Sequence, residues 1–448
     1  MKSISLLLLS FFTFAFTAFP QWTQIGSSLT GLGQYPLICV ADSNIVWVAG
    51  GTGTSPKVYR TVDGGLNWVS IPTASLPYAL YAIAAKDSLT AFVADGGAAP
   101  PIWGGNAKLY KTTDAGLNWT IIDSTGGTAG FYNDIQFSKS NPDFGIATSD
   151  PANGVGEPYI VNKTTDGGVT WTKTNPPGVP NSAGAQASAY VIDPQFYGFA
   201  CANYSTNKAT SYTTSDGGNT WFLGDSSVTI SVVDVVFNDD KQHGVMVGAD
   251  WPYIKVTSNG GNNWVTVNTG ININRPLASW VSGTDIVFVC AQTSPSNRGI
   301  IRSDDNGLTW YQQETPVQTI VEVDNIKYGD AIYAYAVTSN GSILKSIQSV
   351  VTNVESEITP NDNYKLNQNY PNPFNPSTKI KYSVPQMSNV VIRVYDVLGN
   401  EIKTLVNEEK QTGSYEVNFN GTDLPSGVYF YQLRAGDFIE TKKMVLMK

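Results

Sequence analysis

The feature that most constrains this chain is an eight-residue pattern, S/T-x-D-x-G-x-T/N-W, that occurs six times with one Asn in place of the Asp. The Thr or Ser that opens each copy stands at 61, 112, 164, 214, 257 and 303, so successive copies are 43 to 52 residues apart. A repeat near this period indicates a solenoid, a propeller or an array. Short alternating runs flank each copy, so each copy predicts a β-hairpin.

The residue types of the pattern have structural uses in a tight turn. The acidic residue accepts hydrogen bonds from turn amides, and the fixed Gly supplies a left-handed backbone conformation. The Trp ring can pack between neighbouring repeat units. The acidic position is occupied by Asp63, Asp114, Asp166, Asp216, Asn259 and Asp305, and the aromatic position by Trp68, Trp119, Trp171, Trp221, Trp264 and Trp310. We therefore interpret these twelve residues as structural.

The pattern resembles the Asp-box, or bacterial neuraminidase repeat, which lies on the outer hairpin of β-propeller blades. A β-rich run of small residues precedes each copy, and a seventh such run, 332–337, is followed by a strand-like stretch, 342–346, that has no box. Residues 21–25 look like the strand that follows a box. We predict an all-β fold in which residues 20–348 form a seven-bladed propeller closed by the N-terminal strand. An open array with a frayed first strand is the alternative.

The two ends of the chain differ from the propeller. Residues 1–19 have the basic start and apolar run of a secretory signal peptide, and no later stretch is long and apolar enough to span a bilayer. Residues 349–363 are polar and predict a linker, and alternating strands in 364–448 predict a small Ig-like β-sandwich.

The C-terminal segment resembles the type A sorting domain of the type IX secretion system of Bacteroidetes. The similarity lies in the proline-rich opening at 370–378, the Val-Tyr-Asp-Val-Leu-Gly turn at 394–399, the Ser-Gly-Val-Tyr at 426–429 and the basic end at 441–448. It implies that residues 364–448 engage the type IX machinery and are then removed, leaving the propeller secreted or on the outer-membrane surface. An ordinary Ig-like binding domain is the alternative.

Charge and composition limit the partners. The chain carries −9 at pH 7, and residues 364–448 hold ten Lys or Arg against eight Asp or Glu, so the remainder carries −11. An acidic propeller repels nucleic-acid phosphates and anionic membrane surfaces. The three cysteines, Cys39, Cys201 and Cys290, are expected to be free, buried thiols. We expect no cofactor, no metal site and a monomer. For residues 238–240, a bound Ca²⁺ ion is an open alternative to a solvated hairpin.

Sialidase chemistry does not fit the residues present. A sialidase holds its substrate carboxylate with three Arg side chains, whereas the propeller has only four Arg, of which Arg60 and Arg302 lie on third strands away from the axis. Other glycoside hydrolases need two carboxylates. The candidates are Asp95, Asp150 and Asp250, which end second strands on one rim, and the aromatic candidates for sugar stacking on the same rim are Trp103, Tyr159 and Trp251.

The same residues have a structural interpretation, in which the Asp side chains cap turns and the aromatic rings pack between loops. The single His, His243, falls in a hairpin on the opposite rim and is expected to be solvated. We expect a secreted or surface propeller that binds a ligand or glycan, or acts as a scaffold, without catalysis; it is similar in blade style to photosystem II assembly-factor propellers. A polysaccharide-active glycoside hydrolase using two rim aspartates is the alternative.

Overall fold

The computed structural model describes a chain of β-strands in two compact units, residues 1–350 and 351–448. It describes residues 21–98, 104–154, 156–179, 181, 183–203, 208–224, 228–229, 234–248, 252–271, 277–294, 297–317, 319–349, 364–369, 372, 374–385, 387–411, 413–436 and 438–446. The expected signal peptide therefore lies outside the described residues, as does the expected linker except for its first residue, Ser349, which ends a strand.

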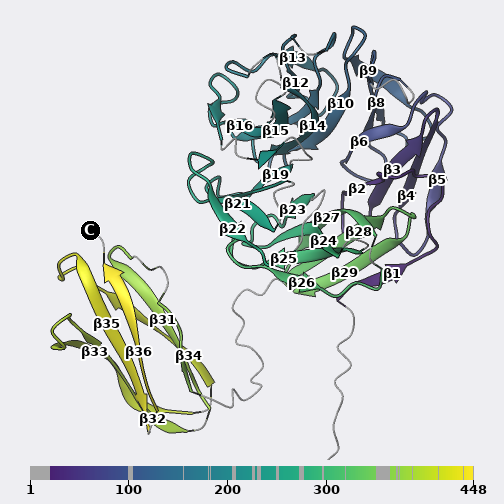
Figure 1. Cartoon of the computed structure of the whole chain (residues 1–448). Helices are drawn as coiled ribbons and strands as arrows, with labels where there is room; N and C mark the ends of the chain where they lie inside the picture. Colours follow the sequence, from purple (N-terminus) through teal and green to yellow (C-terminus); the bar gives the residue numbers. More distant parts are fainter. Residues whose placement is uncertain are drawn as a thin grey trace, which may run out of the picture. The chain divides into compact units, whose positions relative to one another are not determined.

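Seven antiparallel sheets form a ring in the first unit (Figure 1). Blade 1 consists of β2 (Leu37–Val40), β3 (Val46–Thr52), β4 (Ser55–Thr61) and β5 (Val69–Ile71). Blade 2 consists of β6 (Leu80–Ala85), β7 (Ala91–Asp95), β8 (Lys108–Thr112) and β9 (Thr120–Ser124). Blade 3 consists of β10 (Tyr132–Phe137), β11 (Gly145–Ser149), β12 (Ile160–Thr164) and β13 (Thr172–Thr174). In each blade the strands follow one another in sequence, so each blade is a meander.

Blades 4 to 6 repeat this order. They are β14 (Ala183–Val191), β15 (Tyr197–Asn203), β16 (Lys208–Thr214) and β17 (Phe222–Leu223), with β18 (Val228–Thr229) also on β16; β19 (Asp234–Phe237), β20 (Gly244–Val247), β21 (Tyr253–Thr257) and β22 (Val265–Asn268); and β23 (Ala278–Trp280), β24 (Val287–Ser294), β25 (Asn297–Ser303) and β26 (Tyr311–Gln313).

Blade 7 joins the two ends of the propeller. It contains β27 (Ile320–Tyr328), β28 (Ala331–Thr338) and β29 (Ile343–Ser349), and its fourth strand is β1 (Thr23–Ile25) from the N-terminus. Thr23 pairs with Lys345 and Ile25 pairs with Ile343. The predicted seven-bladed ring and its closure by the N-terminal strand are therefore confirmed, and the open array is excluded.

A hydrophobic cluster fills each interface between neighbouring blades in the described part of the propeller. The Trp of every eight-residue repeat packs at the interface with the preceding blade. Trp22, which has no repeat before it, fills the equivalent place between blades 6 and 7 and is completely buried. The central strands of the blades are buried on both faces because a blade packs against each side of them.

All six repeats have the same hydrogen bonds. In the first, the Thr61 hydroxyl donates to Asp63 at 2.7 Å and accepts the Gly65 N–H at 3.0 Å, while Asp63 accepts the Asn67 N–H at 2.9 Å. The other five copies repeat this set with their own residues. The bonds from Asn67 and Thr61 to the ionised carboxylate lower the pKa of Asp63 to about 2.

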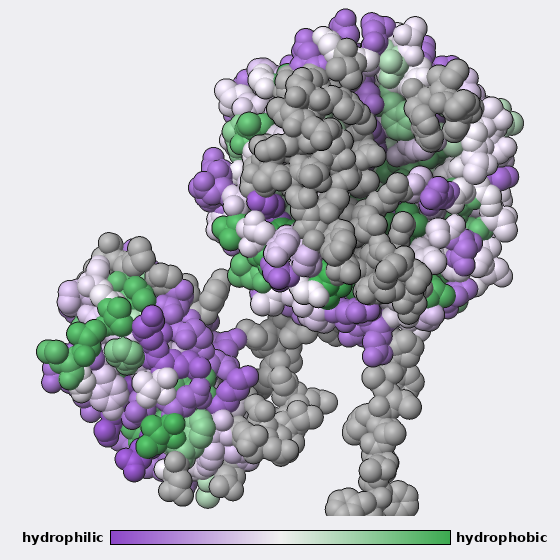
Figure 2. All heavy atoms as spheres, in the orientation of Figure 1, coloured by the Kyte–Doolittle hydropathy of each residue, from purple (hydrophilic) through white to green (hydrophobic). Residues whose placement is uncertain are grey.

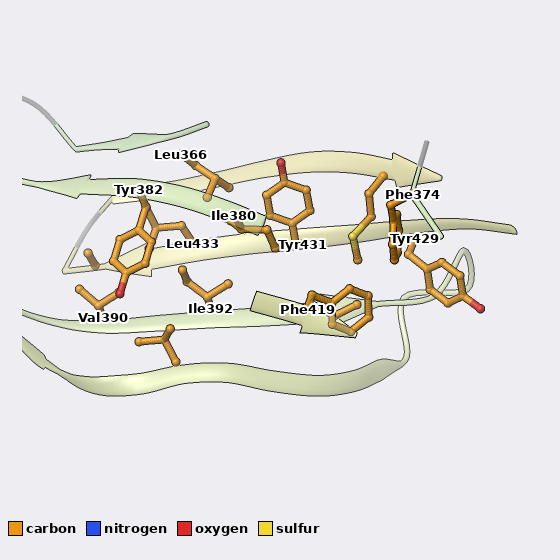
Figure 3. Packing of buried hydrophobic residues seen from close by; sticks show 14 of the residues in the cluster. Leu366, Phe374, Ile380, Tyr382, Val390, Ile392, Phe419, Tyr429, Tyr431 and Leu433 are labelled. Carbon is orange, nitrogen blue, oxygen red and sulfur yellow. The ribbon is translucent and has the colours of Figure 1, made fainter. Parts of the chain in front are cut away.

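The second unit is a two-sheet sandwich. One sheet has the order β30 (Lys365–Leu366), β31 (Ser377–Val384) and β34 (Gly413–Asn420), and the other has β33 (Glu401–Lys410), β32 (Ser388–Tyr395), β35 (Gly427–Ala435) and β36 (Phe438–Leu446). Side chains from both sheets meet in a buried core that includes Ile380, Ile392 and Tyr431 (Figure 3). The predicted small β-sandwich is confirmed.

Candidate functional site

A cavity of about 750 Å³ runs along the axis of the propeller and is lined by residues of the first strands of all seven blades. The first strands start at one end of this channel and finish at the other, where hairpins lead into the second strands. We call the starting end the upper mouth. The connections between blades and the hairpins between second and third strands also lie at this end because successive strands are antiparallel.

Two bulges turn polar side chains toward the upper mouth. The pairing of β6 with β7 shifts register at Tyr81, and the pairing of β10 with β11 shifts at Asn133. A bulge re-aims a side chain relative to a regular strand, and both residues line the cavity. The ring of Tyr81 packs on Phe131 with 4.8 Å between centroids. Asn133 donates to the Asp150 carboxylate at 2.9 Å. The upper mouth thus combines aromatic rings, an amide and a half-buried carboxylate.

Carboxylates within the channel hold neighbouring blades together. Each one accepts a backbone N–H from the first strand of the next blade, as do a serine and a cysteine at equivalent places. The bonds are Ile38 to Glu322 at 3.2 Å, Val40 to Asp324 at 2.7 Å, Ala189 to Asp134 at 2.8 Å, Ala278 to Asp234 at 2.6 Å, Val235 to Ser188 at 3.0 Å and Ala85 to the Cys39 sulfur at 3.2 Å. These side chains are committed to the ring structure.

The protein surrounding Asp134, Asp234 and Glu322 disfavours the charged form of these three carboxyl groups. Burial raises the pKa of Asp134 to about 7, and the charge of Asp234 adds to the rise although the Ala189 N–H opposes it. Burial also raises the pKa of Glu322, with a further contribution from Asp324, and raises the pKa of Asp234. Removal from water penalises a carboxylate more than one amide hydrogen bond stabilises it.

Replacing Asp134 with Asn is expected to flatten the pH dependence of stability. The folded-state pKa is raised, so the stability linked to Asp134 is full below its unfolded pKa of about 4 and is lost as the pH rises through about 7. An uncharged amide oxygen can still accept the Ala189 N–H. Melting temperatures of both proteins should differ little at about pH 4 and should increasingly favour Asp134→Asn toward about pH 8. Parallel curves would contradict the burial of an ionisable group here.

Cations on third strands make a second, outer set of links between blades. Each ammonium group donates to backbone carbonyls in the repeat turn of the next blade. The pairs are Lys111 with Gly167 at 3.4 Å and Gly168 at 3.3 Å, Lys163 with Gly217 at 3.1 Å and Lys345 with Gly64 at 3.0 Å. Arg60 donates to the Ser88 carbonyl, and its guanidinium lies over Trp47. The third-strand Arg residues are thus structural, as the sequence indicated.

The structure describes two of the three predicted catalytic residues and gives them different surroundings. Asp95 is 1% exposed, and its carboxylate accepts the N–H groups of Gly97 and Lys108 and the hydroxyl of Tyr110, each at 2.9 Å. It therefore fastens the ends of its own hairpin, as the turn-cap interpretation held. Asp150 is half-buried beside Asn133 at the upper mouth. Asp250 lies outside the described residues, as do Trp103 and Trp251.

Tyr159 is not available for sugar stacking, contrary to its selection as a ligand-binding candidate. Its side chain is 1% exposed and stacks on Phe199 at 4.8 Å in the core between blades 3 and 4. The sequence suggested a rim position because Tyr159 belongs to the loop that Asp150 opens at the end of the second strand. Cys39 lines the channel and is only partly buried, whereas Cys201 and Cys290 are buried as expected, and all three are free.

The opposite mouth of the channel carries the remaining polar candidates. Asp240 accepts the N–H groups of Gln242 and His243, and its Oδ2 lies 2.6 Å from His243 Nδ1. Asp239 accepts the Gly283 N–H at 2.7 Å. Lys139 of blade 3 reaches the Asn325 carbonyl of blade 7 at 3.4 Å, so its side chain extends across the channel. Within the described ranges, no three His, Cys, Asp or Glu side chains are grouped to hold a metal ion.

Comparison with known families identifies the C-terminal unit. Residues 368–447 match the family described as the secretion system C-terminal sorting domain. These residues are a type IX sorting domain. The protein is therefore exported by type IX secretion and is either secreted or displayed at the cell surface. Across the residues that the structure describes, no helix has the length and apolar character needed to cross a membrane. The curated proteins contain no match to the chain.

Solved structures that match this chain include the following three. YCF48 from Cyanidioschyzon merolae is 17% identical with a TM-score of 0.48, over 72% of this chain and 98% of its own. PorZ, an essential surface component of the type IX secretion system of Porphyromonas gingivalis, is 12% identical with a TM-score of 0.48, over 92% of this chain and 59% of its own. The Niastella koreensis GH74 enzyme is 13% identical with a TM-score of 0.27, over 86% and 83%. Likeness at this level does not carry function to the present chain.

The sorting domain is fixed at its start by the residues that suggested it from sequence. Asn369, directly before the proline-rich opening, donates its backbone N–H to the Tyr431 hydroxyl at 2.7 Å, and its side-chain amide donates to the Thr378 hydroxyl at 3.0 Å. The Phe374 N–H donates to the Val445 carbonyl at 2.9 Å, next to the end of the chain. The opening segment and the last strand of the sorting domain thus form one structural unit.

Proposed function

We propose that the exported propeller is a binding protein without catalytic activity, and that it takes a glycan or protein ligand at the upper mouth of its channel. The observation that supports this most is the axial cavity of about 750 Å³, whose upper end carries Tyr81 and Asn133. Ligand sites in proteins occupy roughly 300–1,000 Å³ and combine aromatic side chains with a few fixed polar groups. The cavity has this size and this combination.

The chemistry of the upper mouth favours a neutral, hydroxyl-rich ligand. An exposed aromatic face stacks on the C–H face of a sugar ring, and an amide beside a carboxylate can exchange hydrogen bonds with hydroxyl groups. Asn133 and Asp150 present such a pair, and Tyr81 supplies the ring. The net negative charge of the propeller disfavours strongly anionic ligands. We further propose that the eight-residue repeats are Asp-boxes that serve only the scaffold.

We propose that catalysis is absent because most of the candidate carboxylates already accept structural hydrogen bonds. Glycoside hydrolysis needs an acid and a second carboxylate about 5–10 Å apart and facing the substrate. Among the described channel and rim residues, Asp95, Asp134, Asp234 and Glu322 accept backbone N–H groups. Asp150, which accepts a hydrogen bond from the cavity residue Asn133, is the described rim candidate whose side chain is only half-buried.

Replacing Tyr81 with Ala is expected to weaken ligand binding by about tenfold or more, because a stacked ring and its buried contact area are lost. The purified protein would be screened on a glycan array, and the best ligand would then be titrated calorimetrically. Tyr328→Ala is the matched control because Tyr328 is 69% exposed at the other end of blade 7's first strand. Equal loss in both variants would count against a site at the upper mouth.

The hydrolase alternative has its own measurement. If the propeller cleaves a glycan that it binds, new reducing ends will accumulate and Asp150→Asn will reduce their rate by at least about a hundredfold. Binding without release of reducing ends supports the non-catalytic proposal. Hydrolysis by the wild type that is lost in Asp150→Asn would replace it with the hydrolase.

A further inference from the structure

The sorting domain presents an apolar tip on a rigid turn between β32 and β33. Asp396 accepts the N–H groups of Leu398 and Asn400 at 2.8 and 2.9 Å, and its second oxygen accepts the Asn400 side chain at 2.9 Å. Gly399 adopts a φ of +82°. This turn holds Val397 at 65% and Leu398 at 83% exposure, and Leu398 is the most exposed large apolar residue in the described chain. The fixed turn leaves both side chains in water.

Exposure alone does not distinguish this turn, because Leu66 at the tip of a propeller repeat is also 72% exposed. The difference is that the sorting-domain tip continues into apolar residues on an adjacent sheet face. Along β32 and β35 the buried residues alternate with residues that face outward. Tyr395 faces outward directly beside the turn, and its cross-strand partner is Phe430.

The apolar region extends across the next strand pair. Val428 of β35 pairs with Val445 of β36, and both residues are half-buried on the outward face. We name this region the apolar stripe; it consists of Tyr395, Val397, Leu398, Val428, Phe430 and Val445. β35 and β36 lie at the front of the sorting domain in Figure 1, and the face seen in Figure 2 carries hydrophobic residues among hydrophilic ones. A continuous apolar region on a solvent-facing sheet indicates an interaction surface.

The charged residues on the outward faces of β32, β35 and β36 have one sign. The outward positions of β32, β35 and β36 in the described residues include Arg393, Arg434 and Lys443 but no Asp or Glu. Glu401 of β33 pairs with Tyr395 and lies 3.6 Å from Arg393, so it offsets that charge and leaves Arg434 and Lys443 as the cations that a partner would meet. A partner that complements this face must therefore offer an apolar depression with acidic groups around it.

We propose that the apolar stripe is the surface by which the sorting domain docks on the type IX export machinery, with Val397 and Leu398 inserted in an apolar pocket and Arg434 and Lys443 facing acidic groups at its rim. The occupant follows from the family match, because a sorting domain acts by being recognised by the export machinery. The rigid Asp396 turn lowers the entropy that docking would otherwise cost.

The test compares export of full-length variants in a bacterium that has type IX secretion. Val397→Ser/Leu398→Ser should lower the exported fraction at least about fivefold, since anchors of this kind dominate small interfaces. Leu89→Ser in the propeller is the matched control, because Leu89 is 53% exposed and Asp87 holds its turn through the Leu89 N–H at 2.7 Å. Export of the double variant at the wild-type level would overturn the proposal.

Two further measurements test the role of charge and the folding of the variants. Arg434→Gln should reduce export, whereas Lys379→Gln, on the other sheet, should leave it unchanged. Equal effects of the two neutralisations would contradict a face-specific partner. Limited proteolysis of the protein that stays inside the cell distinguishes a docking defect from a folding defect. If the retained double variant resists proteolysis as well as the wild type does, the result supports the stripe as a docking surface. If the retained double variant is degraded like an unfolded chain, the proposal is overturned.

Discussion

Replacing Trp22 with Ala is expected to lower the melting temperature of the propeller by roughly 4–7 °C. Truncating a fully buried Trp costs about 3–5 kcal/mol, and a domain of this size loses a little over 1 °C for each kcal/mol. Trp22 is 0% exposed in the cluster between blades 6 and 7, where it meets Phe288 edge-to-face at 6.0 Å. It also adjoins β1, the strand that closes the ring.

Trp22 contributes to stability through ring closure as well as through the contact area that it buries. The interfaces among blades 1 to 6 link neighbouring parts of the sequence, whereas ring closure pairs residues near 22 with residues near 345 and packs blade 7 on blade 1. Loss of the first strand would expose the edge of β29 and the interface below it. Thermal melting of Trp22→Ala should be compared with Tyr328→Ala, whose side chain is exposed and should leave the melting temperature unchanged. A melting temperature within about 1 °C of the wild type in Trp22→Ala would mean that closure contributes little.

Gly218→Val is expected to destabilise blade 4 by about 3–5 kcal/mol. Gly218 has a φ of +94°, which a β-branched residue adopts only with strain. A Cβ atom there would lie 2.4 Å from the Tyr197 hydroxyl. That hydroxyl donates to the Gly217 carbonyl at 2.8 Å, and the Tyr197 ring is buried against Trp221. The new side chain must therefore displace a core residue or unfold the turn.

Gly178→Val separates the two contributions. Gly178 has a φ of +82°, but a Cβ atom there would have no neighbour within 4 Å. Only backbone strain remains, and we expect a loss of about 1–2 kcal/mol. Denaturant unfolding of both variants measures the difference. If the two lose the same stability, the crowding around the repeat turn does not matter and strain alone accounts for the role of this Gly.

Much of the fold could be predicted from local patterns. The six repeats place six hairpins at known distances along the chain, and the unmatched stretches at 332–346 and 21–25 supply the seventh blade in two parts. This succeeded because turn chemistry and strand alternation are properties of neighbouring residues. The sorting domain was predicted in the same way, from turns and strands that follow one another closely.

The candidate site was harder to predict because it depends on which side chain a bulge or a neighbouring blade turns toward the axis. Tyr81 and Asn133 stand in ordinary strand sequences, and only the register shifts bring them to the cavity. The inner carboxylates left a usable signal: acidic residues inside apolar strands, at 321–324 and 233–236, are costly unless a partner is present. Asp95 and Tyr159 were misleading because the hairpin of Asp95 folds back on its carboxylate, whereas Phe199 of the next blade covers the Tyr159 ring.

By itself, the sequence determined the class of fold, the number of blades, the closure by the first strand and the export of the protein, since each depends on short motifs whose geometry is local. The tertiary structure decided which polar groups face the axis and which are consumed in holding blades together. That decision depends on contacts between strands tens of residues apart, where burial and a neighbour's backbone N–H determine whether a carboxylate is free or engaged.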